Sequence, residues 1–372
     1  MYRSIKKSIF EQILEKLIFF DWIFFSLIVL LICVGLLTIH TVDSSNTNYL
    51  LKHSLRIVFA IFLFFTVAMI NIKFWYRISY LFYFFVIALL LYVDFFGMSA
   101  LGAKRWINVY FFNIQPSELM KVAVILALAR YYQFIKVEEI DKITKLIIPI
   151  IIILIPFFLV VKQPDLGTGI FILMVCLGML WLSGVSLKIF ITGFVSLLVL
   201  APFIISFLKP YQKQRILTFL NPENDPLGSG YHIIQSKIAI GSGGFFGKGF
   251  KQGTQSNLEF LPEKHTDFIF TVFSEQFGFI GSVLLILLFF LIIVKILDIS
   301  LKSQNNYSRL VCFGIGFNIF IYLAVNLGMV TGLIPVVGVP LPIISYGGTA
   351  MITTMFALGL VMSAKIHKDH QL

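Results

Sequence analysis

The chain has 372 residues, of which 59% are hydrophobic and 13% are charged, and its formal net charge is +11. Soluble domains carry about 25% charged residues, so this composition excludes an ordinary soluble protein and predicts a polytopic membrane protein. The basic residues are scattered among loops, which argues against nucleic-acid binding and is typical of positively charged cytoplasmic loops. The three cysteines lie in apolar runs without metal-binding spacing, and we interpret them as packing residues.

Ten apolar runs are candidates for membrane-spanning helices, since a span needs about 20 mostly apolar residues. The runs are continuously apolar and lack the alternation expected of a β-barrel. The sequence therefore predicts an all-α integral membrane protein, a single polytopic domain over 1–372, with ten transmembrane helices near 21–40, 51–70, 76–96, 117–134, 145–161, 167–182, 187–207, 268–294, 308–332 and 342–365.

The charge around the first span predicts the orientation. The segment 1–20 is basic, which predicts a cytoplasmic N-terminus, and ten spans then return the tail 366–372 to the cytoplasm. Counting spans from a cytoplasmic N-terminus also places one large loop, 208–267, between the seventh and eighth helices on the extracytoplasmic side. Long loops cross membranes largely regardless of charge, so the basic residues of this loop are compatible with that side and suggest an anionic partner.

A glycine-rich run at 241–249 has the composition of a phosphate-binding loop but not its spacing. The Walker A pattern needs Gly at position 242 and Ser or Thr at position 249, where this chain has Ser242 and Gly249. We interpret the run as a flexible loop lying on the membrane. Contact of its backbone amides with a lipid-linked phosphate is the alternative.

Asp267 ends the polar loop, directly before the apolar run that starts at Phe268. One interpretation is helix N-capping by Thr266 or Asp267. The other is a carboxylate at the lip of a partly dry cleft, where it can act as a general base toward a sugar hydroxyl.

Several further polar residues lie at the membrane or its surface. Glu118 and Lys121 are three residues apart on one helix face, and they form either a functional pair facing a cavity or a structural ion pair near a helix start capped by Ser117. Arg105 can hold a pyrophosphate bidentately or act with Trp106 as an interfacial anchor.

Two shorter outer segments have their own signatures. Asp165 lies in the turn between the fifth and sixth spans, and we interpret it either as a substrate-binding residue or as a turn former and no more. Two prolines and a glycine pair within 338–348 predict a kinked or partly unwound start of the tenth span, which membranes tolerate where it lines a cavity or is buried in protein.

The motifs together resemble the SEDS family of bacterial cell-wall polymerases (shape, elongation, division, sporulation). The sequences at 253–264 and 335–340 are similar to those of the RodA-type members rather than to those of the division members. The segments that carry the resemblance, in chain order, are 102–107, 115–121, 163–168, 225–231, 259–270 and 340–348.

The resemblance implies ten transmembrane helices with the large loop outside. It implies a peptidoglycan glycosyltransferase that joins the disaccharide units of lipid II during cell elongation and rod-shape maintenance, in the inner (cytoplasmic) membrane. It further implies a class B penicillin-binding protein, a transpeptidase, and other elongation-complex membrane proteins as partners. Asp267 matches the essential acidic residue of the family, and Glu118 and Lys121 match its important pair in the fourth span.

We hypothesise an inverting transfer in which Asp267 deprotonates the acceptor hydroxyl. Arg105, Arg215 and Lys264 would neutralise the pyrophosphate leaving group. A divalent cation such as Mg or Mn could share that role, although no ligand cluster in the sequence identifies a metal site. The rival hypothesis is a lipid II flippase or transporter, which the absence of a matching broken helix in the first half of the chain disfavours. A scaffold that only recruits a transpeptidase is a third possibility.

Overall fold

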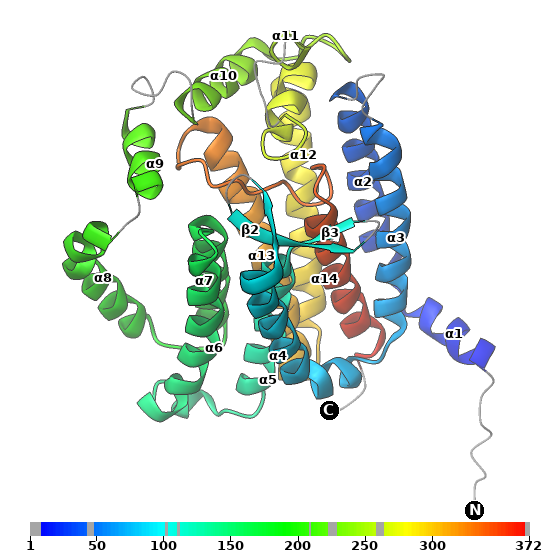
Figure 1. Ribbon diagram of the computed structural model, residues 1–372. Helices are drawn as coiled ribbons and strands as arrows, with labels where there is room; N and C mark the ends of the chain where they lie inside the picture. Colours follow the sequence, from blue (N-terminus) through cyan, green and yellow to red (C-terminus); the bar gives the residue numbers. More distant parts are fainter. Residues whose placement is uncertain are drawn as a thin grey trace, which may run out of the picture.

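The computed structural model describes residues 9–42, 48–100, 103–109, 112–207, 210–221, 229–257 and 264–368. Long helices lie side by side in a bundle, and short helices lie across one end of it (Figure 1). The bundle helices are α2 (Trp22–Val42), α3 (Tyr49–Met69), α4 (Ile72–Phe96), α5 (Pro116–Tyr132), α6 (Ile143–Lys162), α7 (Leu166–Leu182), α8 (Leu187–Phe207), α12 (Ile269–Leu301), α13 (Asn306–Thr331) and α14 (Gly348–Ile366). The others are α1 (Ile9–Ile18), η1 (Val137–Glu139), α9 (Pro210–Leu220), α10 (Ser229–Ser242) and α11 (Thr254–Asn257).

Each of the ten predicted spans coincides with one bundle helix. Among the residues that the structure describes, seven helices are long and apolar enough to cross a membrane, namely α2, α3, α4, α6, α12, α13 and α14. Helices α7 and α8 are shorter apolar helices. Helix α5 has 17 residues, at the lower limit for a span. The predicted all-helical membrane fold is confirmed.

Helix α5 lies inside the bundle, and nearly all of its residues are buried. It packs against α4, α6, α7, α13 and α14. A helix that is enclosed on every side has no lipid-facing stripe. Its ionisable residues Glu118 and Lys121 must therefore find their partners within the protein.

Helices α3 and α14 pack closely against each other. A Cβ atom on Gly359 of α14 would lie 2.9 Å from Val67 Cβ and 3.0 Å from the carbonyl oxygen of Phe64, so only glycine permits this approach. Helix α8 lies at the edge of the bundle, apart from the other long helices (Figure 1), and most of its described side chains are exposed.

A small antiparallel sheet, which the sequence analysis did not predict, lies between α4 and α5 in the chain. Its strands β1 (Met98–Ala100), β2 (Ala103–Val109) and β3 (Phe112–Ile114) have the order β1-β2-β3. The central strand β2 pairs Trp106 with Met98 and Ile107 with Ile114. The ladders satisfy backbone groups that are costly to leave unpaired, and they fix the position of Arg105.

The glycine-rich run, which the sequence analysis interpreted as a flexible loop, forms a turn that docks on a break in α12. Helix α12 is interrupted at Gly278, where φ is 67° and ψ is −163°. The Lys248 amide donates to the Glu275 carbonyl at 3.0 Å, and the Phe279 amide donates to the Gly244 carbonyl at 2.9 Å. Some amides of the run are thus used within the protein.

A buried carboxylate strengthens this junction. Glu275 is fully buried, and its Oε1 accepts hydrogen bonds from Lys248 Nζ at 2.9 Å, from Thr254 Oγ1 at 3.2 Å and from the Gln255 amide at 2.9 Å. Charge-assisted bonds of this kind are stronger than neutral ones. The turn and α11 are therefore tied to α12 through Glu275.

We expect Gly278→Ala to destabilise the protein by about 3 kcal/mol, since this backbone region is almost restricted to glycine. A Cβ atom there would also lie 2.3 Å from the Gly247 nitrogen. Gly241→Ala is the matched control, because a Cβ at Gly241 meets nothing within 4 Å and alanine favours a helix by about 0.5–1 kcal/mol. Thermal unfolding of the purified proteins in detergent checks both changes, and equal melting temperatures for the two variants would contradict the assigned strain.

Candidate active site

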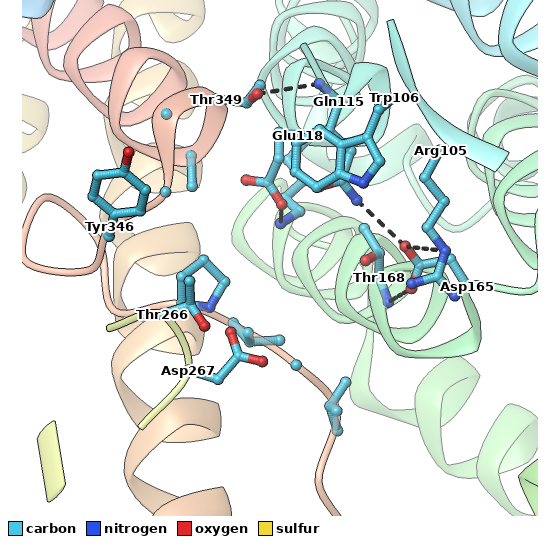
Figure 2. A pocket seen from close by; sticks show the side chains of 18 of the residues that line it. Arg105, Trp106, Gln115, Glu118, Asp165, Thr168, Thr266, Asp267, Tyr346 and Thr349 are labelled. Carbon is cyan, nitrogen blue, oxygen red and sulfur yellow. Dashed lines mark hydrogen bonds and ion pairs between the residues drawn. The ribbon is translucent and has the colours of Figure 1, made fainter. Parts of the chain in front are cut away.

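A cavity of about 330 Å³ opens where the sheet, the bundle and the polar segments meet. Five of the predicted site residues line it together with Asp267: Glu118, Lys121, Arg105, Arg215 and Asp165. Figure 2 shows Asp267 on one side of the cavity and Glu118, Arg105 and Asp165 on the other. Lys264, also predicted for this site, is not among the lining residues. The structure thus gathers residues that lie far apart in the sequence.

Asp267 is half-buried in the turn that precedes α12. The N-cap position of α12 is Phe268, which has no side-chain capping hydrogen bond. The prediction that Thr266 or Asp267 occupies the N-cap position is therefore wrong. A helix with Asp267 as its N-cap would begin at Phe268, whereas α12 begins at Ile269. A Cβ atom on Gly338, whose φ is 79°, would lie 3.3 Å from Asp267 Oδ2, so the segment before α14 passes directly beside this carboxylate.

The turn carrying Asp267 is held by the irregular segment 332–347 that precedes α14. Ser345 Oγ donates to the Thr266 carbonyl at 2.7 Å, and the Tyr346 amide donates to the His265 carbonyl at 2.8 Å. The sequence predicted a broken start of the tenth span here, and the structure confirms it, since α14 begins only at Gly348. Irregular backbone inside a membrane protein is tolerated where it lines a cavity, as this segment does.

Glu118 and Lys121 form a buried ion pair with Tyr322 of α13 as its third member. Lys121 Nζ lies 2.6 Å from Glu118 Oε1 and donates to the Tyr322 hydroxyl at 2.5 Å. The Tyr322 hydroxyl in turn donates to Glu118 Oε2. The ammonium group also lies 4.2 Å from the centre of the Phe171 ring. The three polar groups close a neutral network inside the bundle.

The predicted shared face of Glu118 and Lys121 is confirmed, whereas the predicted cap is wrong. The N-cap position of α5 is Gln115, and Pro116 occupies the first turn, where its missing N–H costs no hydrogen bond. Ser117 therefore lies inside the helix. Tyr322 was missed because it is some 200 positions away in the chain, and its place in an apolar run carries no local signal of a polar contact.

Arg105 joins the sheet to the turn between α6 and α7. Its Nη2 donates to the Pro164 carbonyl at 2.5 Å, and its Nε lies 3.6 Å from Asp165 Oδ2. Asp165 is the N-cap of α7 and accepts from the Thr168 amide at 3.2 Å. The prediction of a turn-forming role for Asp165 is confirmed. The Arg105 side chain is 30% exposed, so part of the guanidinium can still contact a ligand.

The remaining basic residues differ in their placement. Arg215 on α9 is exposed and lines the cavity. Arg56 of α3 packs over the ring of Tyr346, 4.5 Å from its centre, and so lies beside a cavity residue. Tyr49 stacks on His265 in the same region, with ring centres 4.8 Å apart. These contacts hold the 264–268 turn in place, and Arg215 adds a second guanidinium to the cavity lining beside that of Arg105.

The cavity combines carboxylate and cationic groups that suit proton transfer and anion binding. Asp267 supplies a carboxylate at its edge, and Arg105, Arg215 and Lys121 supply positive charge in its lining. Within the described residues, His, Cys, Asp and Glu side chains form no group of three or more that could hold a metal ion. The lining as a whole holds three carboxylates, of Asp267, Glu118 and Asp165, and three cations, of Arg105, Arg215 and Lys121.

Comparisons with known proteins agree with this architecture. The family model for cell cycle proteins of the FtsW/RodA/SpoVE type matches residues 12–370. The peptidoglycan glycosyltransferase MrdB of Escherichia coli (strain K12) is 46% identical over 287 residues, which cover 77% of this chain and 77% of that protein.

Solved structures share the fold over almost the whole chain. A chain from a peptidoglycan synthase complex, studied for the coordination of polymerization and crosslinking, gives a TM-score of 0.82 at 29% identity and covers 95% of this chain and 99% of that one. The rod shape determining protein RodA of Thermus thermophilus gives a TM-score of 0.72 at 24% identity, over 95% and 98% of the two chains. From its matched family model and its identity to MrdB, the chain belongs to the FtsW/RodA/SpoVE family, which is the SEDS family that its motifs indicated.

Proposed function

We propose that this protein is a peptidoglycan glycosyltransferase of the RodA type, which polymerises lipid II into glycan strands. Its family and its similarity to MrdB support the reaction class. The observation that carries the assignment of the site is the cavity, which Lys121 also lines and in which Asp267 lies opposite Glu118 and Arg105 (Figure 2). Its volume of about 330 Å³ gives room for the reacting groups, while the remainder of two lipid-linked substrates must extend outside.

The proposed reaction is a single displacement at a sugar carbon. The Asp267 carboxylate removes the proton of the acceptor 4-hydroxyl group, and the oxygen attacks the anomeric carbon of the donor. The bond from that carbon to the pyrophosphate oxygen breaks, so undecaprenyl pyrophosphate leaves with the electron pair. Because attack and departure occur on opposite faces, the anomeric configuration inverts. General-base catalysis of this kind contributes about 100- to 10,000-fold.

Positive charge near the leaving group is the second requirement. Arg105 and Arg215 line the cavity and can neutralise charge that develops on the pyrophosphate. Lys264 does not line it, so we leave it out of this role. Glu118 and Lys121 are buried and paired, and we assign them to holding the cavity wall and its charge in place. No step is assigned to a metal ion.

Membrane placement and partners complete the proposal. The basic segment 1–20 supports cytoplasmic termini, which puts the cavity on the outer face of the cytoplasmic membrane, where lipid-linked precursors are joined. The similarity to a chain of a peptidoglycan synthase complex supports a crosslinking partner, and we propose a class B penicillin-binding protein for this partner.

Asp267→Asn should reduce the rate of lipid II polymerisation by at least about 100-fold, because an amide cannot accept the proton. The measurement is glycan formation by the purified protein with its transpeptidase partner. Asp94→Asn is the control, since Asp94 pairs with the exposed Lys162 and does not line the cavity. Undiminished polymerisation by Asp267→Asn would remove Asp267 as the base. Wild-type protein that moves lipid II across vesicles and makes no glycan would establish the transporter instead.

Lys121→Met should destabilise the protein by about 3–5 kcal/mol, because it leaves the buried Glu118 without its counter-ion. Adding Glu118→Gln should restore most of that stability. If the pair serves the reaction, the double variant should still polymerise at least about 10-fold more slowly than wild type. Thermal unfolding and glycan formation measure the two effects separately.

The surface pair Glu139 and Lys142 is the matched control for this experiment. It has the same residue types and the same spacing, with Lys142 Nζ 2.9 Å from Glu139 Oε1, but both side chains are exposed. The corresponding double substitution should change stability by no more than about 0.5 kcal/mol and leave polymerisation unchanged. Full activity of the stable Glu118→Gln/Lys121→Met variant would show that the buried pair is structural only.

A further inference from the structure

Asn326 of α13 contacts the backbone of Asp267 itself. Its side chain is fully buried. Its Nδ2 donates to the Asp267 carbonyl oxygen at 2.9 Å and to the Val339 carbonyl oxygen at 2.7 Å. A primary amide has two N–H donors on one nitrogen, and here they are divided between two separate chain segments. One side chain thus joins the turn before α12 to the segment before α14.

The chemistry of the contact requires a donor at this place. Two carbonyl oxygens converge on Nδ2, while Oδ1 has no hydrogen-bond partner within the described part of the chain. Exchanging the amide nitrogen and oxygen would bring Oδ1 against both carbonyls. Leaving buried carbonyls without a donor is costly. The two carbonyls therefore fix the orientation of the amide, and the amide fixes their separation.

Both segments that Asn326 joins form the wall of the cavity around the proposed base. Asp267 and Val339 line the cavity, and Gly338, next to Val339, lies beside Asp267 Oδ2. Separation of the two segments would move the carboxylate away from its neighbouring wall. A displacement of about 1 Å at a reacting group can cost about 100-fold in rate.

Helix α13 connects this contact to the buried ion pair. Tyr322, which bonds Glu118 and Lys121, precedes Asn326 by four residues, so the two side chains lie on the same helix face. The helix therefore sets the position of the Asp267 turn relative to the wall that carries Glu118 and Lys121. Asn326 thus does more than fill space in the core, because it links the position of α13 to that of the Asp267 turn.

We infer that Asn326 is a positioning residue for the glycosyl transfer, and that it acts by holding the backbone of Asp267 against the segment around Val339. The inference rests on the proposed function, in which Asp267 is the general base. It assigns to Asn326 no contact with the substrate. Its loss should therefore lower kcat and leave KM for lipid II nearly unchanged.

The test compares Asn326→Ala with Asn318→Ala in the full-length protein together with its transpeptidase partner. Asn318 is a buried asparagine of the same helix, two turns earlier, and among the described residues it bonds neither segment. Asn326→Ala should lower kcat by about 10- to 100-fold with KM within about twofold of wild type. Asn318→Ala should change neither constant by more than about twofold. Asn326→Ser, which keeps one donor, should give an intermediate kcat.

A second comparison separates this inference from the proposed function. If Asn326 acts through Asp267, adding Asn326→Ala to Asp267→Asn should slow the residual reaction by less than about twofold, because the two changes are then not additive. Additive losses, or equal losses for Asn326→Ala and Asn318→Ala, would overturn the positioning role while Asp267 stays the base. A fully active Asp267→Asn variant would instead overturn the proposed function and this inference with it. Melting temperatures identify a variant that fails to fold, and for such a variant Asn326→Ser decides the result.

Discussion

A lysine and a glutamate buried in an apolar bundle are the constraint on which much of this structure depends. Unpaired charge in such a place is expensive, and the pair is tolerated only when geometry and further hydrogen bonds compensate both members. Lys121 and Glu118 meet this condition through Tyr322 and through the ring of Phe171. The requirement explains why α5 is enclosed by five other helices and why α13 carries a hydroxyl at that level.

The pairing of Lys121 with Glu118 also affects the charge of the cavity wall. Because Lys121 and Glu118 satisfy each other, the wall they form is close to neutral, and the polar character of the cavity comes mainly from its rim. There, Arg105 is anchored to the α6–α7 turn by the Pro164 carbonyl and Asp165. Irregular backbone around Gly338 closes the other side. Broken helix geometry is stable at this depth because its polar groups are bonded within the protein or face the cavity.

The sequence predicted the features that arise from local pattern. Continuous apolar runs gave the ten helices, and paired prolines and glycines predicted the irregular segment before α14. The β1–β3 sheet was missed because β1 and β3 have only three residues each, too few to show an alternating pattern. Tyr322 and Asn326 were missed because their partners are distant in the chain, so that an apolar run with an occasional polar residue gives no indication of what that residue bonds. Lys264 was placed in the site from its neighbourhood to Asp267, but neighbouring residues of a turn point in different directions.

Asp267 shows why local rules fail at such a site. Thr266 and Asp267 are good capping residues, and a missing cap costs a helix about 0.5–2 kcal/mol. The structure nevertheless begins α12 at Ile269, and the N-cap residue Phe268 makes no side-chain capping hydrogen bond. The carbonyls of Thr266 and Asp267 accept hydrogen bonds from Ser345 and Asn326 instead. Tertiary contacts thus hold the turn in a conformation that places the carboxylate at the cavity. A local preference that is overridden in this way is expected at functional sites, and it is independent support for a role of Asp267 beyond folding.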